Sequence, residues 1–206
     1  MKKIIYILIA VFFANCSSKD KVALNSNILI SKTFNKNEIN DLELIFAFFN
    51  NKICPKVKPN NENLTECYLT YCSKNMEQII KTNDYNRNIN YEEQKRFYSK
   101  ISSSTFKEIW SIQKSIPVRD RIDTLKYLSF NHNGKFVRFL KQYGKENKKI
   151  KRYYESFIQY RDITPSMQAI ILMEFKDFDI NDVRTKLVFA IHYLTRNDQI
   201  WRNEKY

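Results

Sequence analysis

Glycine and proline are scarce in this chain of 206 residues, which contains two glycines and four prolines. Tight β-hairpin turns of types I′ and II′ depend on glycine, so a large antiparallel sheet would lack the residues that its turns need. Phosphate-binding loops also require several closely spaced glycines, and a chain with two glycines excludes them. The scarcity favours helices that are joined by loops rich in asparagine and serine.

Histidine is equally scarce, with His132 in a predicted turn and His192 in an apolar helical stretch. Neither lies in a recognised nucleophile motif, and the chain contains no G-x-S-x-G or H-E-x-x-H pattern. The adjacent acids Glu92 and Glu93 are explained by the positive end of a helix dipole. The sequence identifies no catalytic residue. It therefore favours a non-catalytic protein, with a site assembled in space from scattered acids as the alternative.

Long apolar runs are absent from most of the chain, and none reaches the roughly 18 apolar residues that a membrane-spanning helix needs. The one clear run, residues 4–13, follows Lys2 and Lys3. A cationic start, a short apolar segment and a polar cleavage region are the three parts of a secretory signal. At ~1.5 Å per residue this run spans only about half of a ~30 Å hydrocarbon core. We therefore expect segment 1–15 to be a cleaved signal peptide.

The cleavage region reads Phe13-Ala14-Asn15-Cys16 and resembles the lipobox of bacterial lipoproteins. The resemblance implies that the Cys16 sulfur receives a diacylglycerol, that the chain is cut before this residue, and that the new amine receives an acyl chain such as palmitate. Phe13 and Asn15 stand where the usual pattern has Leu and then Gly or Ala, as in looser spirochaete and Bacteroidetes lipoboxes. The following Ser17 implies the outer membrane rather than the inner membrane. An ordinary signal peptide cut elsewhere is the alternative.

Composition divides the rest of the chain into a tether and one domain. Residues 16–35 are rich in Ser, Lys, Asn and Asp and predict a flexible tether. Residues 36–206 are then long enough for one domain with a substantial core and too short for two. The apolar content of 43% and the aromatic content of 15% exclude global disorder. The mature chain as a whole also resembles uncharacterised lipoproteins of low-GC Bacteroidetes, although no domain motif supports that likeness.

Apolar residues recur at helical spacing through most of the domain. The pattern predicts an all-α fold, a bundle-like domain of six to eight helices. Thr164-Pro165 is the clearest helix start, because threonine caps and proline suits the first turn. Gly144 stands where a C-terminal cap would. The weakly alternating stretch before the turn at His132 predicts one short strand or hairpin near 124–134. The helices are expected near 36–54, 64–80, 91–101, 105–112, 136–143, 150–158, 165–175 and 183–194.

Three cysteines remain after Cys16: Cys54, Cys67 and Cys72. Cys67 and Cys72 are five residues apart on one predicted helix, so their side chains point in different directions. A disulfide from Cys54 to Cys67 or to Cys72 would join two predicted helices, and reduced thiols in the core are the alternative. No histidine accompanies them at zinc-like spacing, so we expect neither a metal site nor a cofactor.

The chain is strongly basic, with a formal net charge of +13. A positive surface attracts anionic partners, although dispersed lysines can also serve solubility alone. Nucleic acid is not expected as a partner, because the aromatic rings beside basic residues in Arg96-Phe97-Tyr98 lie at helical core positions. The expected partners are a membrane, through the lipid anchor, and an envelope protein or an acidic polymer.

These observations predict a membrane-anchored protein of the cell envelope with a binding or interaction role. Two alternatives belong to different classes. One is a lipid-anchored envelope hydrolase whose site is built from scattered acids, and the other is a carrier of a hydrophobic ligand. Buried acids that converge in a cleft would favour the enzyme, a large dry cavity would favour the carrier, and a basic face would favour the binding protein.

Overall fold

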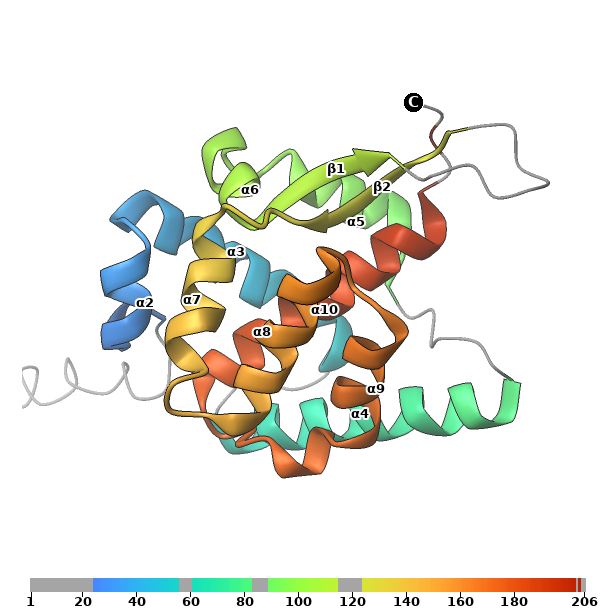
Figure 1. Ribbon diagram of the computed structural model, residues 1–206. Helices are drawn as coiled ribbons and strands as arrows, with labels where there is room; N and C mark the ends of the chain where they lie inside the picture. Colours follow the sequence, from blue (N-terminus) through green and yellow to red (C-terminus); the bar gives the residue numbers. More distant parts are fainter. Residues whose placement is uncertain (1–23, 56–60, 83–88, 115–123, 203, 205–206) are drawn as a thin grey trace, which may run out of the picture.

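The computed structural model describes residues 24–55, 61–82, 89–114, 124–202 and 204. The predicted signal peptide, the lipidation site Cys16 and the first part of the predicted tether lie outside these residues. The described residues are mostly helical, with nine α-helices, two short 3-10 turns and a two-stranded sheet (Figure 1). The predicted all-α fold with one short hairpin is confirmed. The ninth helix, beyond the eight expected segments, lies in the predicted tether.

The elements have the following bounds. They are η1 Leu24–Ser26, α2 Ile28–Thr33, α3 Lys36–Ile53, α4 Asn61–Thr82, α5 Tyr91–Tyr98, α6 Ser103–Ile109, β1 Trp110–Lys114, β2 Lys126–Phe130, α7 Lys135–Tyr143, α8 Lys148–Tyr160, α9 Pro165–Met173, η2 Phe175–Asp177 and α10 Val183–Trp201.

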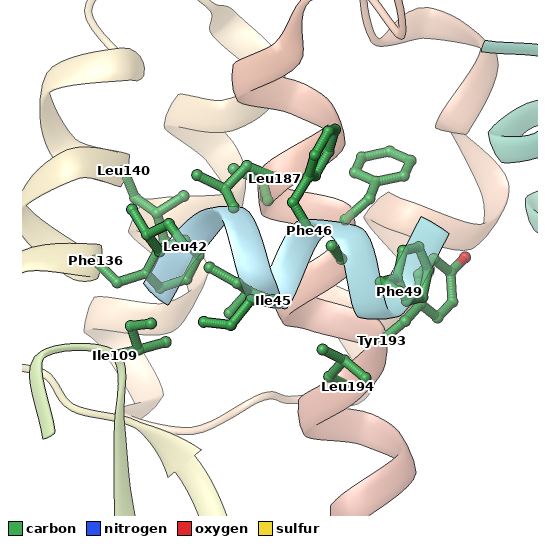
Figure 2. Close-up of a cluster of buried hydrophobic side chains, with 14 of the residues drawn as sticks. Leu42, Ile45, Phe46, Phe49, Ile109, Phe136, Leu140, Leu187, Tyr193 and Leu194 are labelled. Carbon is green, nitrogen blue, oxygen red and sulfur yellow. The ribbon is translucent and has the colours of Figure 1, made fainter. Parts of the chain in front are cut away.

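Helix α10 is the centre of the core. Its residues 185–195 are all buried, and α3, α5 and β2 contact it. Figure 2 shows α3 crossing α10, with Phe46 and Phe49 directed toward the α10 side chains Leu187 and Tyr193. A helix segment that is buried on all sides must be covered on all sides, so neighbouring elements surround this part of α10.

Side-chain hydrogen bonds from capping residues fix where several helices begin. Asn35 and Glu38 form a capping box at the start of α3, in which each side chain binds the other residue's backbone N–H. Thr164 accepts a hydrogen bond from the Met167 N–H, and Pro165 occupies the first turn of α9. Such caps typically stabilise a helix by about 1 kcal/mol.

The predicted tether is wrong in its second part. Leu24, Ile30 and Phe34 are buried in the core, and α2 packs against α3 and α7. The side chain of Asn27 caps α2 by accepting from the N–H groups of Leu29 and Ile30. A six-residue helix is too short to show a period in sequence, and its stability comes from tertiary packing. The domain therefore begins at or before residue 24.

The predicted helix near 105–112 is also corrected. It ends at Ile109, and Trp110 begins strand β1, which pairs antiparallel with β2 from Trp110–Phe130 to Lys114–Lys126. The indole N–H of Trp110 donates to the Thr195 hydroxyl of α10 at 2.8 Å. These long-range contacts favour the strand over the local helical spacing.

Both glycines lie where two backbones meet. A Cβ at Gly134 would overlap the Glu108 carbonyl, and one at Gly144 would lie 2.9 Å from the Lys151 Cα. Gly144 is right-handed, with φ −63°, so it does not form the left-handed cap that its position suggested. Its lack of a side chain instead lets the first turn of α8 approach the end of α7.

Candidate ligand-binding cleft

A cleft of about 510 Å³ lies between the hairpin, the segment after α8 and the last turns of α10. Its walls come from three segments that are far apart in the sequence. The lining residues are Lys114, Leu125, Lys126, Tyr127, Asp162, Ile163, Arg196, Gln199 and Arg202. Four of these side chains are basic and one is acidic, so the cleft favours an anionic ligand.

Asp162 supports the wall of the cleft through its Oδ1 atom. This oxygen accepts hydrogen bonds from the Ser129 hydroxyl at 3.1 Å and the Ile163 N–H at 2.7 Å. Gln199 donates to the same oxygen at 3.4 Å and to the Leu128 carbonyl at 2.8 Å. These bonds connect β2, the segment after α8 and α10. The carboxylate thus has a structural role that holds the three walls together.

Arg202 is held at the end of α10 by a buried carboxylate. Its Nε and Nη2 atoms donate to the two oxygens of Asp198 at 2.7 and 2.9 Å, and its Nη1 atom donates to Glu204 at 2.9 Å. Burial raises the pKa of Asp198, while the paired guanidinium opposes that rise. A charged group that is fixed before binding loses less conformational entropy when a ligand arrives.

Tyr127 gives the cleft a half-buried aromatic ring. Burial and then the nearby Asp162 carboxylate raise the pKa of this phenol above its ordinary value. The hydroxyl is therefore protonated near neutral pH and can donate a hydrogen bond to an anion.

A second hollow of about 410 Å³ lies between α8 and α9. It carries both Arg152 and Glu155, and Arg152 already donates to Glu174 at 3.0 Å. Because its charges are mixed and partly paired, it favours no class of ligand.

The two histidines occupy unlike environments. His132 is exposed in the turn before α7. His192 is fully buried in α10, where its Nδ1 lies 2.9 Å from the Tyr153 hydroxyl and its Nε2 has no hydrogen-bond partner among the described residues. Burial, followed by the charge of Arg196, lowers the pKa of His192 to about 3. His192 is thus a neutral core residue at physiological pH.

Asp41 is a carboxylate that lies among backbone and hydroxyl donors of α6 and its cap. Its Oδ2 accepts from the Ser102 N–H at 3.2 Å and from the Thr105 hydroxyl at 2.6 Å, and Ser102 also donates through its own hydroxyl. Ser102 in turn caps α6. These contacts join α3 to the start of α6, which is a structural role.

Cys54 and Cys67 form a disulfide with a Cα–Cα distance of 5.7 Å, so the structure has the first of the two pairings left open by the sequence. The bond joins the end of α3 to α4. Cys72 is a buried free thiol whose sulfur accepts from the Tyr193 hydroxyl at 3.5 Å. Burial raises the pKa of Cys72 to about 12, so this thiol is protonated and poorly reactive.

Among the described residues, no group of three or more His, Cys, Asp or Glu side chains is placed to hold a metal ion. In the same part of the chain, no helix combines the length and apolar content needed to cross a membrane. The cleft was not predicted from the sequence. The only signal for it in the sequence is the overall positive charge, because the four basic residues come together only in the fold.

Comparison of the chain with protein-family models, curated proteins and solved structures finds no match. The function therefore has to be inferred from the geometry and charge of the cleft.

Proposed function

We propose that this protein is a lipid-anchored, non-catalytic binding protein of the bacterial cell envelope, and that its cleft binds the acidic groups of an envelope polymer. The observation that carries the proposal is the set of four basic side chains around the cleft, drawn from β1, β2 and α10. The lining residues carry an excess of positive charge that would attract the carboxylate or phosphate groups of a polymer, although Arg202 is already paired with Asp198 and Glu204. The outer membrane is the expected location, because Ser17 follows Cys16 and the lipobox resemblance then implies that membrane.

The arrangement of the molecule supports this role. Helix α2, which follows the predicted anchor in the chain, lies at the opposite end of the molecule from the free end of the hairpin (Figure 1). The C-terminal end of α10, which Arg202 follows, lies on the hairpin side. A chain that is anchored near α2 would thus present its cleft away from the bilayer.

The two alternative functions have less support. A hydrolase built from scattered acids needs at least two carboxyl groups near the substrate, and Asp162 is the one carboxylate among the described residues that line the cleft. A carrier of a hydrophobic ligand needs an apolar cavity, whereas five of the nine lining residues are charged.

Removal of two cleft charges is expected to weaken binding of an acidic polymer by about tenfold or more, because a hydrogen bond to a charged group is worth about 1.5 kcal/mol or more. The variant is Lys126→Ala with Arg196→Ala, and the measurement is fluorescence anisotropy with labelled poly-glutamate. Lys145→Ala with Lys148→Ala is the matched control, since these exposed residues carry the same charge outside the cleft. Equal losses of polymer affinity in both double variants would show that the net charge of the protein, and not the cleft, determines binding.

The anchor is tested by metabolic labelling with a clickable palmitate analogue in the native host. The wild-type chain is expected to take up label, and Cys16→Ala is expected to lose it, because the cysteine sulfur is the site to which the lipobox resemblance directs the lipid. Cys72→Ala serves as the control, since that thiol is buried. Equal labelling of the wild-type chain and Cys16→Ala would contradict the lipid anchor.

A further inference from the structure

Helices α2 and α7 form a basic surface. The two helices pack against each other, and between them they contain four basic residues and no acidic residue. Lys135 is paired with Glu38 at 2.6 Å, and the exposed Arg138 lies 3.5 Å from a Glu108 oxygen and donates to the Asn133 carbonyl. Lys32 and Lys141 are exposed as well. A face of one charge sign with no acids within its own helices attracts an anionic surface.

An apolar side chain lies at the start of the same face. Ile28, the first residue of α2, is 70% exposed although its helical neighbour Ile30 is fully buried. One exposed isoleucine on a soluble surface is unremarkable by itself. Beside Lys32, four residues later on the same helix, it forms the pairing of apolar and basic groups that is typical of segments lying at a bilayer surface.

The length of chain between the predicted anchor and the domain limits which surface can meet the membrane. Leu24 is fully buried, and its N–H donates to Glu43 at 2.6 Å, so the start of the folded domain is fixed. Eight peptide units join Cys16 to Leu24 and span at most about 28 Å. A domain of this size is about 40 Å across. The chain can therefore bring the α2 end to the bilayer, but it cannot bring the opposite end there.

We propose that the face formed by α2 and α7, with Ile28, Lys32, Arg138 and Lys141 at its surface, docks on a bilayer that contains anionic lipid. The inference rests on the proposed anchor at Cys16. Basic residues near such a surface each contribute about a fivefold preference, and Ile28 enters the headgroup region. Docking fixes the orientation of the domain, so that the basic cleft faces away from the lipid that would compete for it.

The test uses the acylated full-length protein in vesicles of phosphatidylcholine, with and without phosphatidylglycerol. Ile28→Trp places an additional fluorophore on the face, and its quenching by brominated lipid is the difference from the wild-type chain, which already contains Trp110 and Trp201. Ile80→Trp is the matched control, because Ile80 is 69% exposed on α4. We expect stronger quenching at position 28 than at position 80, and more at position 28 when phosphatidylglycerol is present. Equal quenching at the two positions, or none at position 28, would overturn the docking face.

A charge reversal tests the basic residues separately. Lys32→Glu with Lys141→Glu, added to Ile28→Trp, is expected to lower the ratio of docked to undocked protein by about 30-fold or more. Quenching that survives this change would overturn the electrostatic part of the inference. Mass spectrometry of the same preparation reports acylation at Cys16. A chain without acyl groups overturns the proposed anchor and this inference with it, whereas an acylated chain with an unquenched tryptophan at position 28 overturns only the docking face.

Discussion

Acidification from pH 7 to pH 4 is expected to lower the free energy of unfolding by about 3 kcal/mol through His192 alone. The pKa of this imidazole is about 3 in the folded protein and 6.5 ordinarily. The folded pKa is the lower one, so between these values the unfolded chain binds more protons. Stability is therefore complete above about pH 6.5 and falls as the pH drops toward 3. Burial is the main cause, and the positive charge of the nearby Arg196 further disfavours the protonated ring.

Urea unfolding at a series of pH values measures this effect. His192→Gln keeps a polar group opposite the Tyr153 hydroxyl but cannot take up a proton, so its stability should fall by about 3 kcal/mol less than that of the wild-type chain over the same range. His132→Gln is the control, because that ring is exposed in the turn before α7. If His192→Gln and the wild-type chain lost stability in parallel, the buried imidazole would not be the source of acid sensitivity.

Loss of the disulfide is expected to lower the free energy of unfolding by about 3 kcal/mol, the value that chain entropy gives for a closed loop of this length. Cys54 and Cys67 are 13 residues apart, and the bond joins α3 to α4. The variant Cys54→Ala with Cys67→Ala removes the constraint, and urea unfolding measures the difference.

A reductant provides the internal check on this value. Dithiothreitol should bring the wild-type chain close to the stability of the double variant and should leave the double variant unchanged. Cys72→Ala, which removes the buried free thiol, should respond to the reductant as the wild-type chain does. A wild-type chain whose stability is the same with and without reductant would contradict a stabilising disulfide.

Helix positions were predictable where the signal is local. The capping residue Thr164 lies within three residues of the N–H group that it binds, so the sequence itself shows the beginning of α9. The apolar spacing of α10 likewise continues from Val183 to Leu194, long enough to be read without knowledge of its neighbours, and the helix itself extends to Trp201.

Two elements could not be predicted because their stability comes from distant residues. Trp110 has helical spacing from Phe106, yet its backbone pairs with β2 and its indole binds Thr195 on α10. The six residues of α2 carry too short a pattern to distinguish a docked helix from a tether. In both cases packing between remote segments outweighed the local preference.

The composition and spacing of the sequence by themselves determined that the domain is helical, which residues begin its main helices, and that its surface is strongly positive. Only the tertiary structure decided that Cys54 pairs with Cys67, that residues 24–35 belong to the domain, and that basic groups from β1, β2 and α10 meet around one cleft. The physical reason is the separation along the sequence over which each signal acts. Helical periods and caps depend on residues within about one turn of each other, whereas a cleft and its charge depend on which distant segments the core brings together.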